Sequence, residues 1–323
     1  MKAAILHQFG EVPRYEDFTD PQPGENELLV QVKAVALENI DRAMVRGTHY
    51  ASRQFLPNLP AIIGLDGIGM LEDGQLVGFA GARPPYGAMA ELAVIPKTSY
   101  VPIPAGIDAV TAAALPGSAL TALFPLRWGA NLQPGETVLI NGATGVSGRH
   151  EVQIAKLLGA GRIIGTGRHE ESLKQLRELG ADAVIDLKQS DEQLTEAFLR
   201  EAGTTGYHAI LDFVWGHPTE VLIKALVPRE LSFAKHKIRL IQIGEMAGPA
   251  ISLTADALRT SGLEIAGASA GITPEALTEG TNQVWGWIKE GKISIGIEQV
   301  PLKDIEGAWQ RTNLYGKRMV IVP

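Results

Sequence analysis

A glycine-rich segment carries the clearest chemistry in the sequence. Residues 142–148 read Gly-Ala-Thr-Gly-Val-Ser-Gly, a G-x-x-G-x-x-G spacing that follows an apolar stretch at 137–141 and precedes a helical pattern at 146–158. A pyrophosphate must come close to backbone N–H groups at a helix N-terminus, and a side chain at the turn would block it. The segment therefore predicts a dinucleotide-binding loop, with a tight turn that binds nothing as the alternative. The expected cofactor-binding residues here are Asn141, Gly142, Thr144, Gly145, Val146, Ser147 and Gly148.

The end of the next apolar stretch indicates which dinucleotide is bound. An NAD enzyme usually carries an acid there to bond the ribose 2′-OH, whereas this sequence has Gly167 and Arg168. A carboxylate would repel a 2′-phosphate, and a guanidinium pairs with it. NADPH is therefore the expected cofactor, with Gly167 and Arg168 at the adenosine ribose. In the alternative, Arg168 is solvated and Glu170 or Glu171 binds the ribose, although both glutamates suit the first turn of the following helix.

Further cofactor contacts are expected where other strands end, because ligands lie outside the carboxyl ends of a parallel sheet. The candidates are Phe213, Ile243, Gly244, Ala268 and Ser269. Lys317, in the C-terminal tail, is a further candidate, and a solvated cation at the start of a strand is its alternative.

A doubly wound sheet is needed to position these residues. After a helical stretch at 109–126, strand-like segments alternate with helical patterns that have apolar residues three or four apart. Six strands are predicted, at 137–141, 162–167, 183–186, 208–215, 238–244 and 263–269. Strands that alternate with helices imply right-handed crossovers and a parallel sheet, so the predicted fold class is α/β with a doubly wound Rossmann domain.

The first 120 residues have the pattern of an all-β unit interrupted by glycine and proline. Strands are predicted at 1–9, 28–37, 61–71, 75–80 and 87–96. Many short strands with long connections fit a small barrel. The tail after residue 269 does not continue the alternation, so we expect it to return to the N-terminal domain. Its predicted elements are a helix at 274–289, a strand at 293–300, a helix at 304–312 and a strand at 317–322.

Composition narrows the function. A chain of 323 residues with 45% hydrophobic content predicts two domains. It has no cysteine, which excludes disulfides, thiolate metal sites and a cysteine nucleophile. The net charge of −7, with Lys and Arg scattered, makes nucleic acid and anionic membranes unexpected partners, so a small molecule is the expected one. The sequence shows no apolar signal region and no later run of about 18 apolar residues, so a soluble cytoplasmic protein is expected.

The chain resembles the zinc-free branch of the medium-chain dehydrogenase/reductase superfamily, the quinone oxidoreductase-like proteins. The resemblance covers essentially the whole chain and rests on residues 63–69, 87–92, 112–123, 138–148 and 316–317. It implies a GroES-like β-barrel catalytic domain at 1–118, to which 271–323 return, and a Rossmann NADP-binding domain at 119–270. It also implies an active site in the cleft between the two domains.

The resemblance also implies that no metal is bound. Zinc-dependent relatives have a Gly-His-Glu segment that reads Gly64-Leu65-Asp66 here, and leucine cannot ligate zinc. The seven histidines show no spacing typical of zinc sites. Without a Lewis acid to stabilise an alkoxide, the expected chemistry is hydride transfer to a conjugated acceptor, a quinone or an enone.

Three residues are catalytic candidates on the same resemblance. Relatives carry an Asn-x-x-Asp element in the pocket, and residues 38–41 place Glu38 at the usual Asn, so either Asn39 substitutes after a local shift or the pocket is more acidic. Tyr50 is the candidate donor to the carbonyl oxygen, with packing at a barrel edge as the alternative. Thr121 lies where relatives contact the nicotinamide, with a helix-interior threonine as the alternative.

Two rival functions stay open on the sequence. One is a catalytically weak NADPH-binding sensor or structural protein; the other is an enoyl-thioester reductase, which should need a basic patch for a phosphoadenosine tail. A homodimer is expected, because the last strand of the sheet, at 263–269, would otherwise be an exposed edge with unpaired backbone groups.

Overall fold

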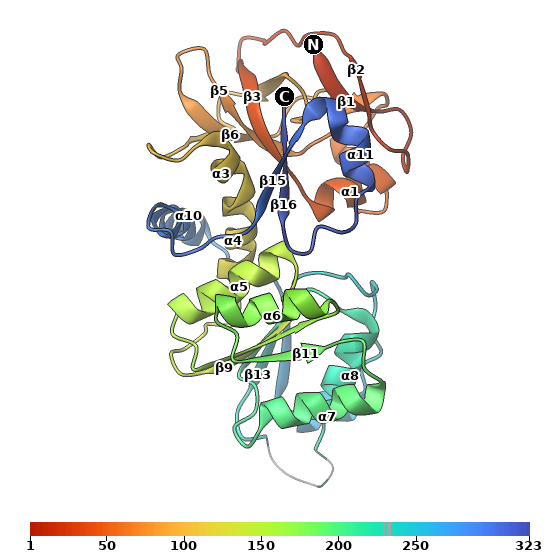
Figure 1. Cartoon of the computed structure of the whole chain (residues 1–323), viewed down its shortest axis with the longest axis vertical. Helices are drawn as coiled ribbons and strands as arrows, with labels where there is room; N and C mark the ends of the chain where they lie inside the picture. Colours follow the sequence, from red (N-terminus) through yellow and green to blue (C-terminus); the bar gives the residue numbers. More distant parts are fainter. Residues whose placement is uncertain (229, 231–233) are drawn as a thin grey trace. The chain divides into compact units, whose positions relative to one another are not determined.

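The chain folds into two compact units. The computed structural model describes residues 1–228, 230 and 234–323. One unit comprises Met1–Gly117 and Gly296–Pro323, and the other comprises Ser118–Ile295 (Figure 1). The first boundary is one residue from the predicted one, whereas the second lies well beyond the predicted return at residue 271.

The unit Ser118–Ile295 is built around a six-stranded parallel sheet. Its strands are β9 (Thr137–Asn141), β10 (Arg162–Gly167), β11 (Ala183–Asp186), β12 (Ala209–Asp212), β13 (Ile238–Gln242) and β14 (Leu263–Gly267). The order β11-β10-β9-β12-β13-β14 is that of a doubly wound dinucleotide-binding sheet. All six predicted strands are present, and the last three end two or three residues earlier than predicted, where the chain turns at the carboxyl edge of the sheet.

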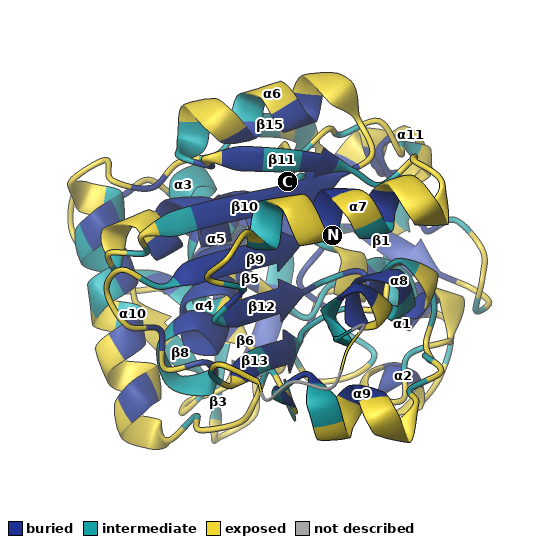
Figure 2. Cartoon of the chain, turned by 90° about the horizontal axis from the view of Figure 1, so that it is seen from below, coloured by how far each residue is buried: buried dark blue, intermediate teal, exposed yellow. Residues whose placement is uncertain are grey.

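Helices cover both faces of this sheet. They are α5 (Val146–Leu157), α6 (Glu170–Leu179), α7 (Asp191–Ala202), α8 (Gly216–Leu226) and α9 (Ala255–Thr260). Helix α5 contacts α6, and α7 contacts α8. Figure 1 shows α5 and α6 on one side of the strands and α7 and α8 on the other. The strands between them are mostly buried (Figure 2), so their continuous apolar sequences are explained by coverage on both faces.

Helix α10 (Pro274–Lys289) lies in this unit, which differs from the predicted return of residues 271–323 to the N-terminal domain. Its Gln283 accepts a hydrogen bond from Arg127 at 2.7 Å. Arg127 belongs to a π-helical turn (Pro125–Gly129) that continues α4 (Pro116–Phe124). The apolar spacing of α10 predicts that one face of the helix is buried, but it does not tell which of the two units covers that face. Only the tertiary contacts assign the helix to this unit.

The unit formed by Met1–Gly117 and Gly296–Pro323 is mainly β-structure. Its strands are β1 (Lys2–Leu6), β2 (Arg14–Asp17), β3 (Glu27–Leu37), β4 (Ala61–Ile62), β5 (Asp66–Met70), β6 (Leu76–Ala80), β7 (Leu92–Pro96), β8 (Tyr100–Pro102), β15 (Ile297–Pro301) and β16 (Arg318–Val322). One sheet has the order β2-β1-β4; the other has the order β15-β16-β3-β5-β6-β8, with β7 also paired to β3. Antiparallel pairing of Met319 with Leu37 brings the last strand of the chain into this unit.

Two features of this unit differ from the predicted strands. The single strand predicted at 61–71 is two strands, because Gly64 between them has a φ of +99°, which interrupts the extended backbone. The pattern does not predict β2 and β8, which are short and lack regular alternation of apolar and polar residues. The helices of this unit are α1 (Asn39–Arg46), α2 (Ser52–Phe55), α3 (Ala109–Ala114) and α11 (Ile305–Gln310).

One helical stretch of the described chain, Ala109–Gly129, is long and apolar enough to cross a membrane by length and composition. It is not an unbroken apolar run, because Thr111, Ser118 and Thr121 interrupt it. In the fold, 56% of its most apolar window is buried, and the core helix of a soluble protein meets the same criterion.

Candidate cofactor-binding site

Two positions of the glycine loop between β9 and α5 accept only glycine. Gly142 has a φ of +89°, and a Cβ there would lie 2.9 Å from Cγ2 of Val214. A Cβ on Gly148 would lie 2.6 Å from Cα of Ala143, so its absence lets the first turn of α5 pack on the loop. A side chain at either position would push the loop out of its place above the sheet.

Gly145, between these two, leaves space at the N-terminus of α5 rather than relieving a tight contact. It is exposed, and the atom nearest to a Cβ there would be the carbonyl oxygen of Gly142, at 3.7 Å. It is the N-cap of α5, and no side chain of the described residues caps this helix. The N–H groups of Val146 and Ser147 therefore have no side-chain acceptor, and with the helix dipole they form a place for an anion such as a pyrophosphate.

A buried network of four polar side chains joins the strands beneath the loop. Thr166 Oγ1 accepts the N–H of Gly142 at 3.0 Å and donates to Asn141 Oδ1 at 2.7 Å. Asn141 Nδ2 donates to Asp212 Oδ1 at 3.0 Å, and Thr219 Oγ1 donates to Asp212 Oδ2 at 2.6 Å. All four side chains are fully buried. The side chain of Asn141 is thus used inside the sheet, which leaves only its backbone for the predicted cofactor contact.

The other strand ends meet the loop at the same edge. Asp212 Oδ1 also accepts the N–H of Val214 at 2.8 Å, which folds the turn after β12 and holds Phe213 near the loop. A Cβ on Gly244 would lie 2.8 Å from the carbonyl oxygen of Phe213, so the turn after β13 packs directly on that after β12. The structure therefore gathers, with the loop, the predicted residues Phe213, Ile243, Gly244, Ala268 and Ser269.

Arg168, the predicted 2′-phosphate ligand, is exposed directly after β10. A Cβ on the preceding Gly167 would lie 2.2 Å from a methyl group of the glycine loop, so this strand end touches the loop. Within the described part of the chain Arg168 has no hydrogen bond or ion pair. Glu170 and Glu171 lie in the first turn of α6, where both pair with Lys174, at 3.1 and 3.7 Å. The guanidinium is available to a ligand, and the two carboxylates are used within the helix.

Two charged residues of α5 are buried although the apolar pattern of the helix does not predict it. Arg149 Nε donates to the carbonyl oxygen of Thr144 at 3.2 Å, and its Nη2 donates to Gln175 Oε1 at 2.8 Å, which ties the loop to α6. Glu151 is fully buried, and neither of its carboxyl oxygens is bonded within the described residues. Burial and, after it, the nearby Asp212 raise the pKa of Glu151 well above its usual value.

The predicted site residues that lie outside the carboxyl edge of the parallel sheet are all exposed. Tyr50 is 95% exposed, and its ring lies 4.2 Å from that of His49. Asn39 is the first residue of the eight-residue helix α1, and Tyr50 lies beyond its last residue, so the two catalytic candidates flank opposite ends of this helix. Thr121 lies on α4, and Lys317 precedes β16.

Glu38 is the first residue of the 38–41 element, at the start of α1. It is the N-cap of α1, where its N–H donates to Asp41 Oδ2 at 2.8 Å and its side chain accepts from the N–H of Asp41. Its carboxylate pairs at 2.8 Å with the buried Arg318, which offsets the added negative charge. Asn39 is exposed. The pKa of Asp66 is raised to about 6, mainly by desolvation and secondly by the charge of Glu38. The residue as a whole is nevertheless exposed to solvent.

Comparison with known proteins finds likeness over the whole chain. A family model described as zinc-binding dehydrogenase matches residues 148–279. The quinone oxidoreductase of Pseudomonas aeruginosa is 31% identical over 302 residues, covering 90% of this chain and 88% of that protein. A trans-enoyl reductase of Aspergillus terreus is 31% identical over 221 residues, covering 58% of this chain and 69% of that protein. The solved structure of Escherichia coli quinone oxidoreductase complexed with NADPH is 25% identical, with a TM-score of 0.83 and full coverage of both chains.

The parallel sheet and its glycine loop define a dehydrogenase/reductase with a Rossmann domain. The chain belongs to the quinone oxidoreductase family of the medium-chain dehydrogenase/reductase superfamily. The predicted fold class, a doubly wound Rossmann domain with a GroES-like barrel, is confirmed. The Escherichia coli complex contains the cofactor that the sequence predicts for this chain.

Proposed function

We propose that this chain is an NADPH-dependent oxidoreductase that transfers hydride to a quinone or another conjugated carbonyl without a metal. The observation that carries the proposal is the exposed Arg168, without a partner in the described chain, beside a glycine loop whose helix N-terminus has no side-chain cap. The loop offers N–H donors to a pyrophosphate, and Arg168 offers the charge that separates NADPH from NADH.

The carboxyl edge of the sheet would hold the rest of the cofactor. Bound NADPH supplies a hydride, and the chain's own part is to bind, orient and exclude water. The backbone at Gly244 and Ser269 lies at the ends of β13 and β14, where a ligand of this fold is held. Asn39, Tyr50 and Thr121 remain our proposed residues for the acceptor side. A Tyr50→Phe variant that lowers kcat but leaves NADPH affinity unchanged would support that role.

The residue chemistry supports a metal-free reaction. Leu65 has an apolar side chain at the position where zinc-dependent relatives use histidine, and the chain contains no cysteine. In the described part of the chain no three histidine, aspartate or glutamate side chains gather in a way that could hold a metal ion. A conjugated acceptor suits such a site, because its oxygen can be stabilised by hydrogen-bond donors alone.

The test is the affinity of the protein for NADPH and NADH, measured by fluorescence titration. A charge-assisted hydrogen bond contributes about 1.5–3 kcal/mol, so Arg168→Ala should weaken NADPH about tenfold to a hundredfold and leave NADH nearly unchanged. Arg200→Ala, which removes an exposed guanidinium from α7, is the matched control and should change neither. Equal loss for both cofactors, or no loss for either, would refute the role of Arg168.

A second candidate, an enoyl reductase, is favoured by the match to the trans-enoyl reductase. Both reactions deliver hydride to a carbon conjugated with a carbonyl group, so they differ in the acceptor and not in the cofactor. NADPH oxidation with a panel of quinones, enones and enoyl thioesters separates them. Absence of saturable turnover with every acceptor would instead favour an NADPH-binding sensor.

A further inference from the structure

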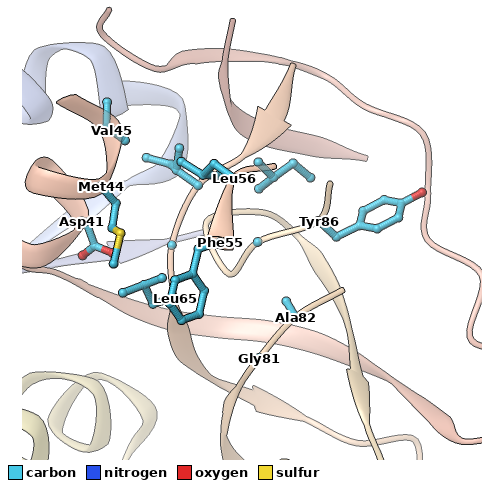
Figure 3. A pocket seen from close by; sticks show the side chains of 13 residues that line it. Asp41, Met44, Val45, Phe55, Leu56, Leu65, Gly81, Ala82 and Tyr86 are labelled. Atoms are coloured by element: carbon cyan, nitrogen blue, oxygen red, sulfur yellow. The ribbon is translucent and has the colours of Figure 1, made fainter. Parts of the chain in front are cut away.

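A small pocket lies within the unit formed by Met1–Gly117 and Gly296–Pro323, and the cofactor site does not use it. Its volume is about 30 Å³, and most of the residues that line it have apolar side chains, Met44, Phe55 and Leu65 among them (Figure 3). Asp41 is the only carboxyl group among the residues that line it. Figure 3 shows Asp41 beside Met44 on the side of the pocket where Leu65 lies.

Only one of the two oxygens of Asp41 is used by the protein. Asp41 is 5% exposed, and its Oδ2 accepts the N–H of Glu38 at 2.8 Å. Among the described residues no donor reaches its Oδ1. A carboxyl oxygen without a partner, on a residue that lines a pocket, is the kind of group that a ligand can satisfy.

The charges around Asp41 decide what it can offer. Desolvation above all, with the charges of Glu38 and Asp66, raises the pKa of Asp41 to about 8, against the opposing effects of the Glu38 N–H and of Arg318. The carboxyl group is therefore mostly protonated at pH 7, so it carries an O–H that can donate. The charge of Arg318 is already paired with Glu38 at 2.8 Å. The group formed by Glu38, Asp41, Asp66 and Arg318 therefore presents net negative charge to a ligand.

We propose that this pocket binds the oxygen-bearing end of an uncharged carbonyl compound, with Asp41 as its single hydrogen-bonding carboxyl group. A carboxylate ligand would meet the negative charges of Glu38 and Asp66, and a ligand without an acceptor would leave the O–H of Asp41 buried and unsatisfied. A volume of about 30 Å³ has room for only about two water-sized groups. It takes a carbonyl group and its neighbouring carbon, while the rest of a larger molecule stays outside.

This inference rests on the proposed function only in identifying the ligand with the hydride acceptor. If it is the acceptor, the O–H of Asp41 is the donor that stabilises the developing negative charge on its oxygen. The site and its ligand class can be tested without NADPH, which separates the two proposals.

The experiment measures binding of hexan-2-one and of its charged isostere pentanoate to the full chain without cofactor, by ligand-observed NMR titration. The wild type should bind the ketone and reject pentanoate. Asp41→Asn should bind the ketone within about twofold of the wild type, because the amide keeps the acceptor for Glu38 N–H and presents an N–H donor. Asp41→Leu should weaken the ketone at least about fivefold. Glu72→Gln, at an exposed position in the same unit, is the control and should change nothing.

The pH dependence gives a second readout that a merely structural role would not produce. Because the donor is lost as Asp41 ionises with a pKa of about 8, ketone affinity of the wild type should fall about tenfold from pH 7 to pH 9. Asp41→Asn should show no such fall. Equal ketone binding by the wild type and Asp41→Leu, tighter binding of pentanoate, or no ketone binding at all would overturn the proposal. Ketone binding together with no NADPH oxidation by any quinone or enone would leave the pocket standing and count against the proposed function.

Discussion

Removing the hydroxyl of Thr166 is expected to destabilise the unit that carries the glycine loop. Thr166→Val keeps the shape of the side chain, so it creates no cavity, but it removes an acceptor for Gly142 N–H at 3.0 Å and a donor to Asn141 Oδ1 at 2.7 Å. The asparagine oxygen is fully buried and then has no partner, which costs about 1–3 kcal/mol. The N–H of Gly142 is half-buried and can be partly hydrated, so its loss costs less. The total is about 2–4 kcal/mol.

Thermal unfolding followed by circular dichroism measures this loss. For a unit of this size about 2–4 kcal/mol lowers the Tm by roughly 5–15 °C. Hydrogen exchange of peptides from β9 and β10 assigns the loss to this unit. Thr278→Val, which removes an exposed hydroxyl bonded to its own helix at 3.0 Å, is the matched control and should cost less than about 0.5 kcal/mol.

The same variant separates positioning from charge recognition. Because Gly142 N–H sets the turn of the loop, Thr166→Val should weaken NADPH and NADH equally, in contrast to Arg168→Ala. The double variant Thr166→Val with Asn141→Leu should be less unstable than the two single losses added together, since it leaves fewer unsatisfied groups. A Tm within about 1 °C of the wild type for Thr166→Val would refute the reasoning.

Four further predictions concern charge, metal and assembly. The pKa of Asp41 rises from 3.8 to about 8 on folding, so the folded state binds one more proton than the unfolded state between these values. As the pH rises, this group should therefore lower the free energy of unfolding by about 1.4 kcal/mol per pH unit. Urea titrations from pH 5 to 7.5 should show this as a difference in pH slope between the wild type and Asp41→Asn. Glu151→Met should stabilise the protein by roughly 1–3 kcal/mol in the same assay at pH 7, because it removes a buried carboxyl group that has no partner in the described chain; a loss of stability would contradict this account. We predict no zinc in elemental analysis and no loss of activity with chelators, and stoichiometric zinc would show the opposite. We predict a homodimer through β14, whose outer edge pairs with no strand in the described chain; a monomeric mass by light scattering at micromolar concentration would disprove it.

The Rossmann unit was readable from the sequence because its signals are local. The strands β9, β10 and β11 and helix α10 have the predicted bounds, since each is an apolar or amphipathic run closed by glycine, proline or a capping residue. The sequence predicts the strands of the N-terminal unit less accurately. Its strands β2 and β8 are short and depend on partners far away in the chain, and the break at Gly64 comes from a backbone angle that the residue type permits but does not require.

The cofactor edge was predicted as a set of residues but not as a connected structure. The glycines of the loop and the guanidinium of Arg168 could be found because a spacing and a residue type suffice to mark them. Thr166, Asp212 and Thr219 could not, since their hydrogen bonds with Asn141 join side chains of separate elements. No sequence pattern distinguishes such a threonine from one that merely faces the core.

The sequence by itself determined the class of fold, the glycine loop, the expected cofactor and the absence of cysteine, because these follow from residue type and spacing along the chain. Only the tertiary structure decided which charges are paired and which are desolvated. Glu38 is balanced by Arg318 from the far end of the chain, and Asp41 and Glu151 have raised pKa values because packing removes water from them. The reason is physical: ionisation depends on the dielectric surroundings and charges within a few ångströms, and those neighbours are set by packing and not by order along the chain.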